Sequence, residues 1–183
     1  MRSTEYLQFL PEGVDKGAKV FEKLRSIVLT FCRVLHYKNG VPFGKGRYRM
    51  AVQLFEQNAK AYPAAVKMMQ QYGKAAIVHP TGTGKSYIAF KLIEDHPDAV
   101  IVWLSPSEYI FKTQRESLLR QDPDFPLQNV RFYTYAKLIC CTPVQLQEIA
   151  AQNPAYIILD EFNRAGAEYW GDSTQKMLAL CPR

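Results

Sequence analysis

The stretch AAIVHPTGTGKS, residues 75–86, decides the fold of this chain. Its four apolar residues predict a strand, and its end matches the phosphate-loop pattern G-x-x-x-x-G-K-[ST], although His79 stands where that pattern has its first glycine. Gly82 and Gly84 let the main chain curl, so that successive N–H groups point inward at an anion. A glycine-rich turn without a ligand is the alternative. The strand before the loop and the helix expected after it favour phosphate binding.

The side chains of this loop suit a nucleotide and its metal ion. Lys85 supplies a point charge for the β- and γ-phosphates, and the Ser86 hydroxyl is a ligand for Mg²⁺. Thr83 is expected to contact phosphate through its backbone N–H. The predicted nucleotide-binding residues of the loop are Thr81, Gly82, Thr83, Gly84, Lys85 and Ser86.

A second apolar run, YIIL at residues 156–159, leads directly into Asp160 and Glu161. Four apolar residues followed by two acids are typical of a buried parallel strand whose carboxyl end meets solvent. Ligands of open α/β sheets bind at that edge. Asp160 would hold Mg²⁺, and Glu161 would orient or polarise an attacking water. The alternative is an ordinary strand that ends in solvated acids.

These two segments together resemble the first motor domain of superfamily-two helicases and translocases. The matching residues are TGTGKS at 81–86 and LDEF at 159–162, and DEFNRAGA at 160–167 looks like the DEFHRxGA form of some bacterial DEAD/DEAH helicases. The resemblance covers residues 52–183. It implies a RecA-like domain that hydrolyses ATP with Mg²⁺ through Lys85, Asp160 and Glu161. It also implies a nucleic-acid partner, for which we expect DNA rather than RNA.

Two weaker stretches fit the same family. VWLSPS at 102–107 looks like the motif that touches the nucleic-acid backbone, and FYTYAKL at 132–138 is similar to a stretch found in restriction-enzyme motor subunits. An alternative for Ser107 is the N-cap of the following helix. The resemblance implies nucleic-acid contacts by Ser105, Pro106, Ser107, Gln114, Thr134 and Tyr135.

The chain departs from the family pattern in three places. Asn163 replaces the usual His or Asp of the second motif, which puts the coupling of hydrolysis to strand movement in question. Asn58 stands at the adenine-reading glutamine, with a solvated helix face as the alternative. The third motif and the second motor domain do not appear. We therefore expect a fragment, a truncated product or a decayed copy that binds ATP with Mg²⁺ and hydrolyses it poorly.

Three other functions stay open beside the helicase or translocase interpretation. One is the motor subunit of a restriction system. Another is a nucleotide-binding or DNA-binding module without useful turnover. The third is a phosphate-loop protein that has no nucleic-acid partner, which predicts no salt-dependent binding to DNA or RNA.

The charge of the chain is unevenly distributed. Its 183 residues carry a formal net charge of +6, and all of that excess lies in residues 1–50. Basic residues that alternate with aromatics around 37–49 suit a polyanion, and a flexible basic linker is the alternative. The four cysteines lack C-x-x-C spacing, so we expect reduced thiols and no zinc. No signal peptide or membrane span is expected, which favours a cytoplasmic location.

The order of predicted elements indicates an α/β fold with a parallel sheet and helices on both faces. We expect a basic helical extension and linker over 1–46, with a helix over 16–37, and the RecA-like domain over 47–183. A further helical region over 48–72, interrupted near Pro63, precedes the alternating elements. The predicted strands are 74–79, 99–104, 129–133 and 155–160, and the predicted helices are 85–95, 107–120, 143–151 and 165–180.

Overall fold

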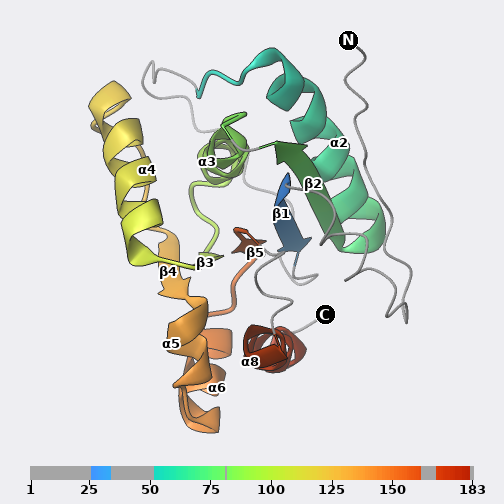
Figure 1. Cartoon of the computed structure of the whole chain (residues 1–183), viewed down its shortest axis with the longest axis vertical. Coiled ribbons are helices and arrows are strands. Elements are labelled where there is room, and N and C mark those ends of the chain that lie inside the picture. The colour runs from blue at the N-terminus through green and yellow to red at the C-terminus, as the bar shows by residue number, and fades with distance from the viewer. Residues whose placement is uncertain (1–25, 34–51, 81, 162–167, 182–183) are drawn as a thin grey trace.

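The computed structural model describes residues 26–33, 52–80, 82–161 and 168–181, with side chains described at 52–80, 82–161 and 172–181. A five-stranded sheet has the order β2-β1-β5-β3-β4 (Figure 1). The strands are β1 Ser26–Arg33, β2 Lys74–Pro80, β3 Ile101–Ser105, β4 Val130–Thr134 and β5 Tyr156–Leu159. The helices are α2 Glu56–Tyr72, α3 Lys85–Asp95, α4 Glu108–Gln121, α5 Tyr135–Ile139, α6 Pro143–Ala151 and α8 Glu168–Leu180.

The predicted α/β class is confirmed. β3 pairs in parallel with both β4 and β5, and helices flank this part of the sheet. β1 is antiparallel to β2 on one side and to β5 on the other. β2 therefore runs in the same direction as β5, and the carboxyl ends of both strands face the same edge of the sheet.

The helix predicted over 16–37 is wrong at residues 26–33, which form strand β1. The rest of that range and the linker predicted over 40–46 lie outside the described residues. The apolar residues of this segment have helical spacing, but Ile27, Val28 and Thr30 are β-branched and favour a strand. Pairing on both sides decides the outcome, because both neighbouring strands satisfy the backbone of β1. The spacing of apolar residues in a short run does not by itself distinguish a helix from a strand.

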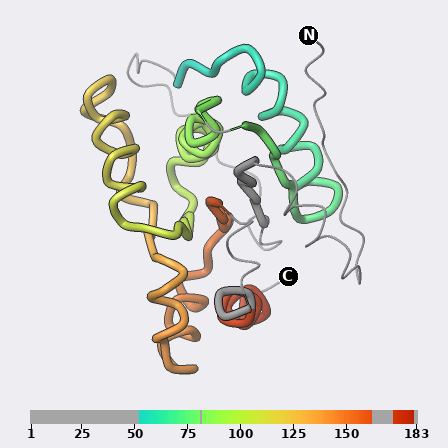
Figure 2. The backbone as a smooth tube through the Cα atoms, in the orientation of Figure 1, coloured from blue at the N-terminus to red at the C-terminus, as the bar shows by residue number. Residues whose placement is uncertain are grey.

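Side chains of the parallel strands alternate between two apolar cores, one on each face of the sheet. Trp103 and Ile158 face a core that is shared with α2, α3 and α4. Leu104 and Leu159 face the opposite core, which α5, α6 and α8 complete. Figure 2 shows these two helical layers on opposite sides of the strands. β3 is thus followed by a helix on one face and β5 by a helix on the other, which is the arrangement that opens a ligand crevice between neighbouring strands.

Helix α2 runs through Pro63 without a break. The proline removes a hydrogen bond to the carbonyl of Ala59, but both residues are exposed, so water can satisfy that carbonyl. The predicted interruption near Pro63 is therefore wrong. Neither α2 nor any other helix in the described ranges is long and apolar enough to cross a membrane.

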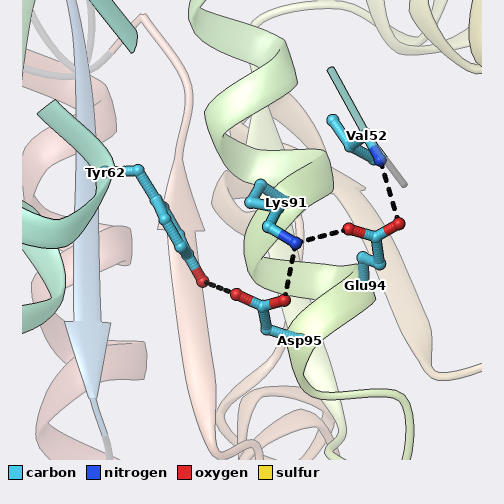
Figure 3. Close-up of polar contacts among 5 residues, drawn as sticks. All are labelled: Val52, Tyr62, Lys91, Glu94 and Asp95. Atoms are coloured by element: carbon cyan, nitrogen blue, oxygen red, sulfur yellow. Dashed lines mark hydrogen bonds and ion pairs between the residues drawn. The ribbon is translucent and has the colours of Figure 1, made fainter. Parts of the chain in front are cut away.

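Polar contacts tie α2 and the segment before it to the far end of α3 (Figure 3). The Tyr62 hydroxyl donates to Asp95 over 2.6 Å, and the backbone N–H of Val52 donates to Glu94 over 2.9 Å. Lys91 bridges the two acids, with contacts of 2.7 Å to Glu94 and 2.9 Å to Asp95. These contacts hold α2 alongside α3 and so fix the position of the residues that α2 brings to the loop at the other end of α3.

Candidate functional site

The loop after β2 has the curled backbone that the sequence predicts. Gly82 has φ 82° and Gly84 has φ 73°, both in the left-handed region that favours glycine. The Thr83 hydroxyl donates to the carbonyl of Pro80 over 2.8 Å and closes the turn. Helix α3 begins at Lys85, directly after Gly84. Thr81 lies outside the described residues.

Position 84 also has no room for a side chain. A Cβ at this position would lie 2.6 and 2.7 Å from two ring carbons of Phe55, a separation that real Cβ atoms do not show. Phe55 precedes α2 and packs edge-on against Tyr87 of α3, with ring centroids 6.0 Å apart. No sequence pattern indicated Phe55, because a single aromatic residue before a helix does not predict contact with a loop.

Asn58 of α2 fixes the outer side of the loop. Its Nδ2 donates to the carbonyls of Thr83, at 2.9 Å, and of Gly84, at 3.0 Å, and Gln57 donates more weakly to the Thr83 carbonyl at 3.4 Å. Only this orientation of the amide lets it bond with two carbonyls, because Oδ1 is an acceptor. The side chain is 0% exposed. In this structure the amide predicted to read adenine is therefore directed at the loop backbone, and the solvated helix face weighed as its alternative is excluded.

Lys85 is held inside the loop. Its ammonium donates to the carbonyls of His79, at 2.8 Å, and of Pro80, at 2.6 Å. Burial lowers the pKa of Lys85, and the negative charges of Asp160 and Glu161 act on it in the opposite direction. Ser86, the next residue of α3, is half-buried.

Asp160 is held at the end of β5 by its backbone. Its N–H donates to the Leu104 carbonyl over 2.8 Å, and its own carbonyl accepts from the Tyr135 hydroxyl over 2.9 Å. Asp160 is 5% exposed, and the nearby amide of Gln114 lowers the pKa of its carboxyl. The half-buried Glu161 follows with φ 51°, an uncommon conformation for a residue with a side chain.

The environment of Asp160 makes its carboxyl harder to ionise in the absence of a cation. Burial and the charge of Glu161 raise the pKa of the Asp160 carboxyl to about 6. The backbone hydrogen bond of Glu161, the charge of Lys85 and the nearby Gln114 amide oppose this rise without cancelling it. A positive ion placed beside such a buried carboxylate stabilises its ionised form.

The lysine of the loop and the two acids after β5 interact electrostatically. The charges of Asp160 and Glu161 act on Lys85, and the charge of Lys85 acts on Asp160. The sheet brings them together because Thr30 of β1 pairs with Ala76 of β2 and with Leu159 of β5. Two segments that are far apart in the sequence therefore share one edge of the sheet.

The residues to which the resemblance gives nucleic-acid contacts have other partners here. Ser107 is the N-cap of α4 and accepts from Tyr109 N at 3.1 Å, which is the alternative that the sequence left open. Thr134 caps α5 in the same manner, accepting from Lys137 N at 3.0 Å. Ser105 and Tyr135 are both 0% exposed. Their burial leaves little side-chain surface for a nucleic acid in this structure.

Gln114 and Pro106 complete that set. Pro106 is half-buried between β3 and α4. The Gln114 amide lowers the pKa of Asp160, which places α4 close to the acid end of the site. A nucleic-acid contact by Gln114 stays a prediction.

Comparisons with protein-family models, with curated proteins and with solved structures gave no match to this chain.

Proposed function

We propose that this chain is a RecA-like, ATP-binding domain of a nucleic-acid-dependent ATPase, of the helicase or translocase type. The observation that carries the proposal is the position of Lys85. Its ammonium lies on the loop carbonyls of His79 and Pro80 and interacts with the acids that end β5. A glycine-rich curl, a lysine and a buried acid at one sheet edge are the parts that a triphosphate and its metal ion need.

The residues present fit ATP and Mg²⁺. Mg²⁺ in such sites is bound through one or two carboxylates together with phosphates and waters. Asp160 supplies a buried carboxylate, and Ser86 supplies a hydroxyl at the start of α3. Among the described residues no group of three or more His, Cys, Asp or Glu side chains is arranged to hold a metal ion. The site would therefore take its ion together with the nucleotide, as this class of site does.

Each residue has a specific part in the proposed activity. The backbone N–H groups at 82–84 would bind phosphate oxygens, and Lys85 would leave the loop carbonyls to bind the β- and γ-phosphates. Ser86 and Asp160 would hold Mg²⁺, which supplies charge neutralisation of the transferring phosphoryl group. Glu161 would orient the attacking water.

A module with little turnover is the second candidate function, and one observation favours it. In the part of the chain that the structure describes, the only cation whose charge acts on Asp160 is Lys85. Phosphoryl transfer in related sites gains about 10³–10⁵ in rate from an additional arginine. We therefore propose that the 183-residue chain binds ATP with Mg²⁺ and turns it over slowly.

The nucleic-acid partner, with DNA proposed rather than RNA, rests on the family resemblance and on the basic excess in residues 1–50. The same support extends to a motor subunit of a restriction system. Binding of single-stranded and duplex DNA, measured between about 50 and about 200 mM salt, tests this part of the proposal, because phosphate contacts weaken steeply over that range. Salt-independent binding, or none, would leave a phosphate-loop protein without a nucleic-acid partner.

The nucleotide part is tested by calorimetry with ATP and Mg²⁺ on the parent chain and its variants. Lys85→Ala is expected to lose most of its triphosphate affinity, whereas Lys67→Ala, an exposed lysine of α2, is expected to bind like the parent. Asp160→Asn is expected to keep its affinity in EDTA and to lose the enhancement by Mg²⁺. Equal binding of ATP and Mg²⁺ by the parent, Lys85→Ala and Asp160→Asn would contradict the site assignment.

A further inference from the structure

Phe55 is an exposed aromatic residue at the edge of the phosphate loop. It lies directly before α2 and is 54% exposed. Its Cε2 and Cδ2 atoms lie 2.6 and 2.7 Å from the place that a Cβ on Gly84 would occupy. One edge of the ring therefore borders the loop, while more than half of the residue's surface is open to a ligand.

A chain of aromatic contacts fixes this ring in position. Phe55 packs edge-on against Tyr87 of α3, with ring centroids 6.0 Å apart. Tyr87 packs in turn against the buried Phe90 at 5.9 Å, and its hydroxyl accepts from Nε2 of Gln121 at 3.0 Å. An exposed ring held in this manner is preorganised, so it binds a flat partner at little cost in side-chain entropy.

The nucleotide proposed for this site has a flat part that must lie outside the loop. A triphosphate bound by the N–H groups at 82–84 leaves the ribose and base to extend beyond them. Phe55 borders the loop at Gly84 and the first turn of α3 at Tyr87. A base that extends on this side would meet the ring, and stacking on an aromatic ring is a common way in which proteins bind bases.

The two side-chain amides of α2 nearest the loop bond with its backbone. Asn58 donates to the carbonyls of Thr83 and Gly84, and its Oδ1 is enclosed by protein. Gln57 donates to the same Thr83 carbonyl at 3.4 Å. ATP and GTP differ in the hydrogen-bonding groups of their bases, and a site rejects one of them strongly only where it bonds with those groups. Stacking, in contrast, tolerates every base, because each base has a π-face.

We propose that Phe55 is the stacking surface for the nucleobase and that the site accepts ATP and GTP alike. This inference rests on the proposed function, because it requires a triphosphate in the loop. It assigns base binding to a ring instead of the amide of Asn58, to which the resemblance gives recognition of adenine. The alternative is an ordinary exposed phenylalanine, which is common on protein surfaces and predicts no contribution from the base.

The test compares ATP, GTP and inorganic tripolyphosphate by calorimetry, all with Mg²⁺, because tripolyphosphate occupies the loop without a base. The parent chain is expected to bind ATP and GTP about 5- to 150-fold more tightly than tripolyphosphate, which is the range that stacking of one base supplies. The affinities for ATP and GTP are expected to agree within about tenfold.

Phe55→Leu keeps an apolar side chain and removes the ring. It is expected to lose most of the preference for ATP and for GTP over tripolyphosphate, by the same factor for both, while its affinity for tripolyphosphate stays like that of the parent. Tyr72→Leu is the matched control and is expected to bind all three ligands like the parent. It removes an exposed aromatic residue at the opposite end of α2, about 25 Å away along the helix.

A fluorescence measurement reports the stacking itself. In Phe55→Trp, the indole emission that exceeds the emission of the parent is expected to be quenched by ATP and by GTP but not by tripolyphosphate. Phe55→Tyr keeps a ring of similar size and is expected to retain the parent's preference in calorimetry. It replaces the Trp variant if that variant does not fold.

The outcomes are distinguishable. If the parent binds neither tripolyphosphate nor ATP, the proposed function is wrong and the inference fails with it. If the parent binds both equally, or if Phe55→Leu keeps the parent's preference, phosphate binding by the loop stands and the role of Phe55 is overturned. An equal loss of tripolyphosphate affinity in Phe55→Leu would also overturn it, because that result indicates damage to the loop. A preference for ATP over GTP of more than about tenfold would overturn the tolerance of bases.

Discussion

The hydroxyl of Tyr135 donates a 2.9 Å hydrogen bond to the backbone carbonyl of Asp160. The ring that follows β4 thereby fixes the main chain at the end of β5, and the donor is fully buried. Burial raises the pKa of Tyr135, and the charges of Asp160 and Glu161 raise it further, so the hydroxyl stays protonated and remains a donor. The acid end of the site is thus held from two sides, by the Leu104 carbonyl of β3 and by Tyr135 directly after β4.

Tyr135→Phe tests this contact. The variant leaves the Asp160 carbonyl without its buried donor, and we expect the free energy of unfolding to fall by about 1–3 kcal/mol. Urea denaturation followed by circular dichroism measures the change. Tyr109→Phe is the control, because Tyr109 is 75% exposed and its loss of a hydroxyl is expected to have little effect. Equal stability of Tyr135→Phe and Tyr109→Phe would show that the hydrogen bond does not stabilise the chain.

Gly84→Ala tests whether the loop is limited by space as well as by backbone conformation. Gly73, the C-cap of α2, has φ 71° and open space within 4 Å of where a Cβ would lie, whereas a Cβ on Gly84, at φ 73°, would meet Phe55. Gly73→Ala is expected to cost about 1 kcal/mol for the left-handed backbone alone, and Gly84→Ala is expected to cost more. Thermal unfolding of both variants measures the difference.

A second substitution identifies the cause of the extra cost in Gly84→Ala. Phe55→Leu in that background removes the ring atoms in contact and is expected to recover part of the lost stability. The double-mutant cycle should therefore show coupling between positions 55 and 84. Strict additivity of the two changes would place the cost of Gly84→Ala entirely in the backbone.

Asn58 variants distinguish fixing of the loop from recognition of adenine. Asn58→Asp would place a carboxylate against the carbonyls of Thr83 and Gly84, so we expect it to destabilise the chain more than Asn58→Ala does. If the side chain acts on the loop, the affinities for ATP and GTP should fall by the same factor. Competition binding with both nucleotides measures this. A selective loss of ATP affinity would restore the adenine-reading interpretation.

The raised pKa of Asp160 makes a prediction about stability and pH in metal-free buffer. The folded value of about 6 lies above the ordinary value of 3.8, so the folded state binds this proton more tightly than the unfolded state does. This contribution to stability is fully present below pH 3.8 and is lost as the pH rises through about 6. Its size is on the order of 3 kcal/mol at most, since one pKa unit corresponds to about 1.4 kcal/mol.

Asp160→Asn isolates this contribution, because the amide resembles the protonated acid at every pH. The variant is expected to match the parent near pH 4 and to be more stable than the parent at about pH 7 to 8, both without metal. Urea denaturation of parent and variant across this range measures the difference. A constant difference between the two proteins would show that Asp160 does not titrate as its burial implies.

The alternating part of the fold was predictable because strong local signals coincide there with the tertiary structure. The apolar runs 75–78 and 156–159 became β2 and β5, and the residues after them became the loop and the acid end. Gly82 and Gly84 predicted positive φ angles that the backbone has. Short elements were predicted less well, since α5 at Tyr135–Ile139 was not expected as a helix.

The remaining features depend on contacts between elements. The spacing of apolar residues along a single sequence does not reveal these contacts. Strand β1 depends on two partners that follow it in the chain. The contacts of Asn58 with the loop and of Tyr135 with Asp160 depend on how α2 and the end of β4 face their neighbours. These residues were noted from the family resemblance, but their partners were visible only once the sheet order was known.

The antiparallel strand β1 has a consequence for the assembly of the chain during synthesis. Thr30 can pair with Ala76 early in synthesis. Its pairing with Leu159 forms later, because Leu159 is synthesised near the end of the described residues. Until then one edge of β1 is open and is able to pair with the wrong partner. The β1–β5 ladder, which closes last, also brings Asp160 next to the loop, so the metal site proposed above would form only when this ladder is complete.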